Sequence, residues 1–151
     1  ETPTPTASCL FLAVLEVPSN PSPLEGEGRV RGSWFLAVLD TIARNVYLYD
    51  PGTLKAKPTL AFTLPSDIAP LAFTSQKDSL WVLDGKSLVL IQFRQDGHGQ
   101  WRKAAAMRPS LATGSQALAA TASVFIADEQ TLYLILETDP PRLVMARKKK
   151  K

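Results

Sequence analysis

Three observations predict an all-β fold for this chain of 151 residues. Its apolar residues fall in short runs rich in Val, Leu, Ile and Tyr, which is typical of strands. Three of these runs, "FLAVLD", "LWVLD" and "VFIAD", end on Asp40, Asp84 and Asp128, which are spaced 44 residues apart. The run "FLAVL" also occurs twice, at 11–15 and 35–39. Self-similarity at a fixed period indicates a repeated structural unit.

Each copy of the repeat predicts a hairpin in which a polar turn led by aspartate joins two apolar strands. Segments 79–91 and 123–135 align without a gap, and 35–49 fits with two extra residues in the turn. An aspartate at the start of a tight turn accepts hydrogen bonds from backbone N–H groups just downstream. We therefore interpret the three aspartates as turn formers rather than as a carboxylate cluster. Further strands are expected at 60–64, 68–74, 101–107, 117–122 and 142–146.

Four short strands in each unit resemble one blade of a β-propeller, in which four-stranded antiparallel sheets pack around an axis. The likeness is to degenerate blades of the NHL and quinoprotein-like kind, because WD and kelch signatures are absent from the sequence. It implies about three blades, with repeats near 34–64, 67–107 and 116–147. Typical propellers have four to eight blades, so we do not expect this chain to close a ring alone.

Segment 115–137 also fits a helix, which would make the fold α+β. It contains good helix formers, a serine suited to the N-cap, and apolar residues near helical spacing. The ungapped match between 79–91 and 123–135 favours strands instead.

The segment between the two FLAVL copies is rich in proline and glycine and predicts a surface loop. Its sequence "NPSPLEGEGRVRG" resembles peptides encoded by mobile repeat elements that insert in frame into bacterial genes. We expect an insertion at about 17–34 that duplicated FLAVL, so that deleting 17–40, with Asp at position 16, would restore one continuous strand. The alternative is two strands of one sheet joined by a long loop, in which the extra copy supplies the inner strand of the first blade.

The composition, 45% apolar and 21% charged, is typical of a folded globular protein. Residues 1–8, "ETPTPTAS", are typical of an extended linker before a globular part at 9–147. A chain that begins with Glu1 is expected to be a processed or excised product. The linker favours an extracytoplasmic or membrane-associated location in a bacterium, with a cytoplasmic location as the alternative.

The net charge of +3 comes from the C-terminal end of the chain. Without the five cations there, 12 of the 17 basic residues remain against 14 acidic ones, so the body has no basic nucleic-acid-binding surface. The basic tail at 148–151 predicts either a solvated end or weak contact with an anionic membrane surface, without specific nucleic-acid recognition. The residues of this contact would be Arg147, Lys148, Lys149, Lys150 and Lys151.

Residue types that support catalysis or metal binding are scarce. Cys9 is the only cysteine, which excludes an internal disulfide and a cysteine-based zinc site. His98 is the only histidine, and its setting "QDGHGQ" predicts an exposed hairpin turn rather than a catalytic triad. The glycines of "GEGRVRG" at 26–32 open no helix, as a dinucleotide loop requires. We expect no enzyme activity, no catalytic or metal-binding residue and no cofactor.

The expected function is that of a non-catalytic β-propeller-type binding or scaffolding module. Its partner would be a protein, or further propeller blades, and exposed Trp34 and Trp101 would contact a protein or a glycan. The alternatives are part of a propeller enzyme, such as a hydrolase, lactonase or quinoprotein-like enzyme, and a structural subunit of a membrane-associated assembly.

Overall fold

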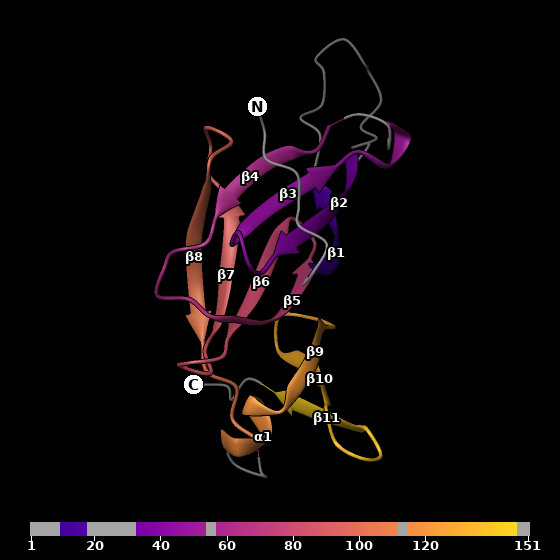
Figure 1. The fold of residues 1–151 in the computed structure, drawn as a ribbon, viewed down its shortest axis with the longest axis vertical. Helices are drawn as coiled ribbons and strands as arrows, with labels where there is room; N and C mark the ends of the chain where they lie inside the picture. The colour runs from indigo at the N-terminus through magenta and orange to yellow at the C-terminus, as the bar shows by residue number, and fades with distance from the viewer. Residues whose placement is uncertain (1–9, 18–32, 54–56, 112–114, 148–151) are drawn as a thin grey trace.

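The computed structural model describes residues 10–17, 33–53, 57–111 and 115–147, and this part of the chain is all-β (Figure 1). The first antiparallel sheet has the order β1 (Leu10–Val17), β2 (Ser33–Asp40), β3 (Asn45–Tyr49) and β4 (Thr59–Thr63). The second has the order β5 (Pro70–Gln76), β6 (Ser79–Asp84), β7 (Leu90–Gln95) and β8 (Trp101–Met107). The third has the order β9 (Thr121–Ile126), β10 (Thr131–Leu136) and β11 (Arg142–Arg147). Two short helices complete the described elements, the 3-10 helix η1 (Pro51–Thr53) and α1 (Ser115–Ala119).

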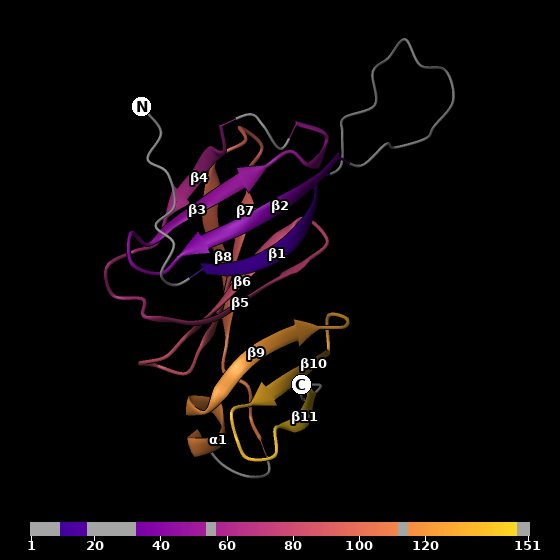
Figure 2. The ribbon, with the colours of Figure 1, turned by 45° about the vertical axis from the view of Figure 1, so that its right-hand side comes forward.

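The first strands of the three sheets lie next to one another, with β5 in contact with both β1 and β9 (Figures 1 and 2). Between β1 and β5, the Glu16 N–H donates to the Lys77 carbonyl at 3.1 Å, and the Ser75 hydroxyl donates to the Val14 carbonyl. Each later strand pairs with the one before it in the chain, so every sheet extends away from its first strand. This arrangement is compatible with a propeller-like fold.

Two hydrophobic cores separate the three sheets, and the second sheet contributes to both. All six residues of β6 are buried. Leu80 and Val82 belong to the core shared with the first sheet, whereas Trp81 and Leu83 belong to the core shared with the third. Successive side chains of a strand point to opposite faces, so a strand between two cores has to be apolar at every position. "SLWVLD" meets this requirement at its four central residues.

The two copies of FLAVL form neighbouring strands. β1 and β2 pair along their whole lengths, from Leu10 opposite Asp40 to Val17 opposite Ser33. Leu15 of the first copy and Leu39 of the second are both fully buried in the core next to the second sheet. The interpretation as two strands of one sheet is therefore confirmed, whereas the expectation that deleting 17–40 would restore one continuous strand stays a prediction. The connecting loop at 18–32 lies outside the described residues, so its origin as an insertion remains a prediction.

The third sheet differs from the sequence alignment. A strand was expected at 117–122, but α1 covers its start, and the alternative of a helix through 137 is also wrong because the helix ends at Ala119. From Ser123 onward burial alternates, with Val124 and Ile126 buried and Phe125 exposed. "SVFIAD" is thus the first strand of its sheet, whereas the aligned "SLWVLD" is the second strand of its own. The expected strands at 60–64, 68–74, 101–107 and 142–146 are confirmed.

Candidate functional site

Asp40 and Asp84 close the β2–β3 and β6–β7 hairpins as turn formers. The Asp40 Oδ1 atom accepts hydrogen bonds from the Ile42 and Ala43 N–H groups, each at 2.9 Å. Asp84 accepts the Ala69 and Lys86 N–H groups on Oδ1, at 2.9 and 3.2 Å, and both the N–H and the hydroxyl of Ser87 on Oδ2, at 3.1 and 2.5 Å. Burial alone would raise the pKa of Asp84, but these hydrogen bonds, led by the Ser87 hydroxyl, lower it below its ordinary value. The carboxylate is ionised and fully used in holding the turn.

Asp128 forms the same kind of turn at a different place. Its Oδ1 atom accepts the Gln130 N–H at 2.7 Å, and this bond is the main reason that the pKa of Asp128 is lowered. Asp128 follows the first strand of its sheet, β9, whereas Asp40 and Asp84 end the second strands of theirs, β2 and β6. First and second strands are antiparallel, so Asp128 lies at the opposite edge of its sheet. In the described part of the chain, no three His, Cys, Asp or Glu residues are grouped closely enough to hold a metal ion.

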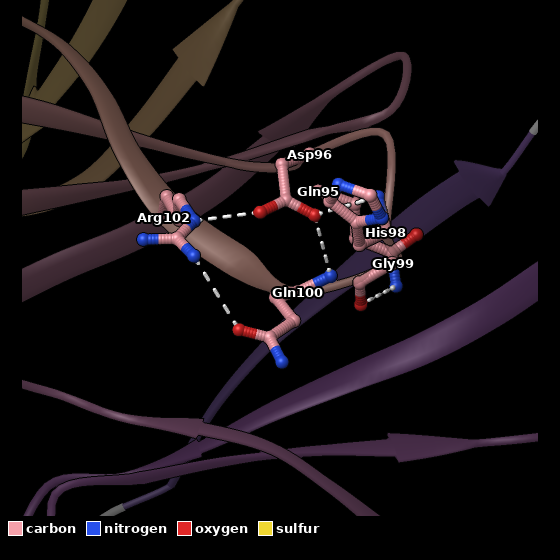
Figure 3. Close-up of polar contacts among 6 residues, drawn as sticks. All are labelled: Gln95, Asp96, His98, Gly99, Gln100 and Arg102. Atoms are coloured by element: carbon pink, nitrogen blue, oxygen red, sulfur yellow. Dashed lines mark hydrogen bonds and ion pairs between the residues drawn. The ribbon is translucent and has the colours of Figure 1, made fainter.

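His98 lies exposed in the turn between β7 and β8, which confirms its predicted position (Figure 3). Asp96 organises this turn: its Oδ1 atom accepts the N–H groups of His98 and Gln100, at 2.8 and 3.0 Å, and its Oδ2 atom accepts Arg102 Nε at 2.6 Å (Figure 3). The hydrogen bond from the Arg102 guanidinium is the main cause of a lowered pKa of Asp96. These contacts use the backbone N–H of His98 and hold the shape of the turn.

The first sheet presents an apolar surface on the side away from the second sheet, which we call the first outward face. Its exposed residues are Leu10, Leu12, Val14, Trp34 and Leu60. The strand pairing places them on one side, because Glu16 lies opposite Trp34, Val14 opposite Leu36, and Leu12 in the same cross-strand row as Leu60. Val38 and Tyr47 lie between Leu12 and Leu60 in this row and are buried, so the centre of the face is already covered and the exposed residues lie on either side of it.

The third sheet presents a second apolar surface, on the side away from the second sheet, which we call the second outward face. Its exposed residues are Phe125, Ile135, Leu143 and Met145. Tyr133 joins them, since it lies between Phe125 and Met145 in one cross-strand row, with its ring centroid 6.5 Å from that of Phe125. Ten large apolar side chains are exposed among the described residues, and nine of them lie on the two outward faces; the tenth is Ile42, in a turn.

The two tryptophans expected to contact a partner have different settings. Trp34 begins β2 and leaves 54% of its surface exposed on the first outward face. Trp101 begins β8 and is half-buried, with its ring centroid 5.4 Å from that of Phe62 at the outer end of the first core. Trp34 is thus available to a partner, and contact through Trp101 remains a prediction.

A groove of about 670 Å³ lies where the first strands of all three sheets end. Trp34 and Glu16 line it from the first sheet, Lys77 from the second, and Asp128 and Glu129 from the third. A smaller groove of about 290 Å³ adjoins it and is lined in part by Trp81, whose buried indole N–H has no hydrogen-bond acceptor in the described structure. The larger groove combines hydrogen-bond donors, carboxylates and one exposed indole, a mixture that suits a polar ligand. The sequence did not predict this groove, because its lining residues come from segments far apart in the chain.

Arg147 ends β11 as an exposed residue, and the lysines at 148–151 lie outside the described residues. No helix in the described part of the chain is long and apolar enough to cross a membrane.

The chain is expected to bind acidic liposomes at low salt and to be released as salt rises. Each cation near an anionic surface contributes about 1 kcal/mol, and this attraction is screened within a Debye length of about 10 Å at 0.1 M salt. Co-sedimentation across a salt series measures the effect, with the four lysines replaced by glutamine as the control. Retention at high salt would show that the body, not the tail, holds the lipid surface.

Comparison of the chain with protein-family models, with curated proteins and with solved structures finds no match in any of the three. The outward faces and the groove are therefore interpreted from their own chemistry.

Proposed function

We propose that the chain is a non-catalytic, β-propeller-type binding or scaffolding module that binds protein through its two outward faces. The observation that carries this proposal is that nine of the ten exposed large apolar side chains lie on those faces. Monomeric proteins seldom leave large contiguous apolar patches in water, and such patches mark sites of protein association.

The strand sequences support the same function. β1, "LFLAVLEV", is apolar at its first six positions, which is the pattern of a strand covered on both sides. In the structure Leu15 is buried, whereas Leu12 in the same strand is 62% exposed. Covering an exposed leucine fully contributes about 1.5–3 kcal/mol, so several such residues on each face suffice to drive association. In this proposal a protein partner covers the outward side of β1.

A sheet of another blade is the partner that fits these faces best. The first strands β1, β5 and β9 lie side by side, and the sheets pack in chain order, as successive blades of an NHL or quinoprotein-like propeller do. In this proposal the partner is a protein or further blades. Contact of the basic tail with a membrane and an extracytoplasmic or membrane-associated location belong to the same proposal.

Binding of the dye ANS, which reports exposed apolar surface, tests the proposal. We compare the wild-type chain with the double variant Leu12→Lys/Leu143→Lys, which places one charge on each face. The control is Ile42→Lys, because Ile42 is as exposed, at 61%, but lies on neither face. The wild type is expected either to bind ANS more strongly than the double variant or to self-associate in light scattering, and the control is expected to match the wild type. A monomeric wild type that binds no more dye than the double variant would contradict the proposal.

A further inference from the structure

We infer that the two adjoining grooves at the ends of the first strands form one binding site for a neutral saccharide. The larger groove, of about 670 Å³, is lined by residues of all three sheets, and the smaller, of about 290 Å³, by residues of the second and third. Cavities of this size are typical of sites for small ligands. The inference goes beyond the proposed function, because a saccharide would occupy the grooves and leave the outward faces to a protein.

The smaller groove contains a buried donor that the protein leaves unpaired. Trp81 is 6% exposed and lines this groove, and its indole N–H has no acceptor in the described structure. Buried polar groups nearly always have a hydrogen-bond partner, and an unpaired one lowers stability. An oxygen atom of a ligand would supply the acceptor that Trp81 lacks.

The strand register brings further polar groups to the same groove. Ser79 and Trp81 are two residues apart in β6, so both point toward the third sheet. Gln92 lies opposite Trp81, and Arg94 lies opposite Ser79. The Ser79 hydroxyl accepts Gln92 Nε2 at 2.8 Å and Arg94 Nε at 3.3 Å, which holds these two side chains in place. The Gln92 carbonyl oxygen and the Arg94 Nη atoms have no partner among the described residues, so a ligand can bind them.

The larger groove combines an exposed indole with charges of both signs. Trp34 is 54% exposed and lies directly opposite Glu16 in the β1–β2 pair. Lys77 lines the groove from the turn between β5 and β6, and Glu129 from the turn between β9 and β10. In the part of the chain that the structure describes, none of these three charged side chains forms an ion pair. The groove therefore offers donors and acceptors around one flat apolar ring.

This combination favours a neutral saccharide over a charged ligand. A hydroxyl group both donates and accepts, so the hydroxyls of one sugar can accept from Trp81 and Lys77 and donate to the carboxylates. The apolar C–H face of a sugar ring can stack on Trp34. An anion would be repelled by three carboxylates, which outnumber the one lysine in the described lining of the larger groove. An ammonium group has no lone pair with which to accept the Trp81 N–H.

The indole N–H signals of the full chain, labelled with isotope-enriched tryptophan, test the site in one NMR titration. Of the three tryptophans, Trp34 and Trp81 line the grooves, whereas Trp101 lines neither and is an internal control. The probes are maltotriose, cellotriose and the trimer of N-acetylglucosamine. At least one of them is expected to shift the Trp34 and Trp81 signals together and saturably, with the Trp81 proton moving downfield as it gains an acceptor. The Trp101 signal is expected not to move.

Variants separate the grooves from the outward faces. Trp34→Ala is expected to weaken binding by about tenfold or more, as truncation of an aromatic anchor does. Leu12→Ala is its matched control and should bind as wild type does, because Leu12 is exposed on the first outward face and lines neither groove.

Trp81→Phe keeps an aromatic ring but removes the donor, and is expected to weaken binding about twofold to tenfold, the effect of one hydrogen bond. Trp101→Phe makes the same change outside the grooves and should bind as wild type does. Circular dichroism checks folding. If Trp81→Phe fails to fold, the Trp34 and Trp101 variants still assign the Trp81 signal of the wild type by elimination, and its shift gives the result.

Four results would overturn the inference. The first is that no neutral trisaccharide shifts the signals, and the second is that the Trp34 signal shifts without that of Trp81. The third is tighter binding of trigalacturonate, of the glucosamine trimer or of trialanine, which would assign the grooves to an acid, an amine or a peptide. The fourth is equal affinity of wild type and Trp34→Ala, or a loss of affinity in Leu12→Ala, which would place the ligand outside the grooves. None of them changes the ANS comparison, which tests the proposed function separately.

Discussion

Deleting residues 17–40, with Glu16 changed to Asp, is expected to lower the free energy of unfolding by about 3 kcal/mol or more, or to prevent folding. The remaining FLAVL would pair with β3 in the place of β2, and the first sheet would lose the strand that lies on β5. That strand buries Leu15 fully and packs Phe11 and Ala13 against the core. Full burial of one leucine alone contributes about 1.5–3 kcal/mol.

The matched control removes only the loop. Replacing 18–32 by Asn-Gly leaves both strands and joins Val17 to Ser33, which are already paired, through the shortest favoured hairpin turn. Its free energy of unfolding should stay within about 1 kcal/mol of wild type, because closing a long loop costs little more than closing a short one. Urea unfolding followed by circular dichroism, at one protein concentration for all variants, gives both values. Equal stability of the two deletions would show that β1 is not needed.

Asp84→Ala is expected to lower the free energy of unfolding by about 2–4 kcal/mol. Asp84 is 4% exposed and accepts four hydrogen bonds, so its removal leaves the Ala69 N–H, just before β5, and the Ser87 groups of the β6–β7 turn without this acceptor. The control is Asp128→Ala, which removes an exposed aspartate whose hydrogen bonds, with Gln130 and Thr131, stay within its own turn. We expect a much smaller loss there, and losses of equal size would contradict the role given to Asp84.

The stabilising effect of Asp84 should also depend on pH. Its pKa in the folded protein is lower than the ordinary value of 3.8, so the unfolded chain binds the proton more readily. The contribution is complete above that ordinary value and is lost as pH falls toward the lowered pKa of the folded protein. Asp84→Asn cannot titrate, so its free energy of unfolding should fall less steeply than that of wild type below about pH 4. Parallel curves for the two proteins would show that Asp84 does not carry the effect.

Most strands of this protein could be read from local sequence. Runs such as "LWVLD" and "RLVMA" combine β-branched and aromatic residues with turn residues at their ends, and hairpins are decided within a dozen residues. The aspartate turns were predictable for the same reason, because the carboxylate binds N–H groups two or three residues away. The exposed turn around His98 belongs to this class too.

The order of strands in the third sheet was not readable in the same way. Segments 79–91 and 123–135 have the same local pattern, so their alignment predicted the same place in a sheet. A hairpin can supply either the first and second strands of a sheet or the second and third. Which of the two applies depends on whether the segment before the hairpin forms a strand. Here α1 replaces the expected strand and places Leu118 in the core beside β9.

By itself, the sequence determined the all-β class, the position of most strands and the turns that join them, because strand period and turn chemistry act over a few residues. Only the tertiary structure decided that both FLAVL copies are strands of one sheet, and which apolar side chains of each end sheet remain exposed. Leu12 and Leu15 are the same residue type in the same strand, yet one is 62% exposed and the other fully buried. The difference arises from the sheet packed against one side of β1, and that neighbour comes from residues more than fifty positions away in the chain.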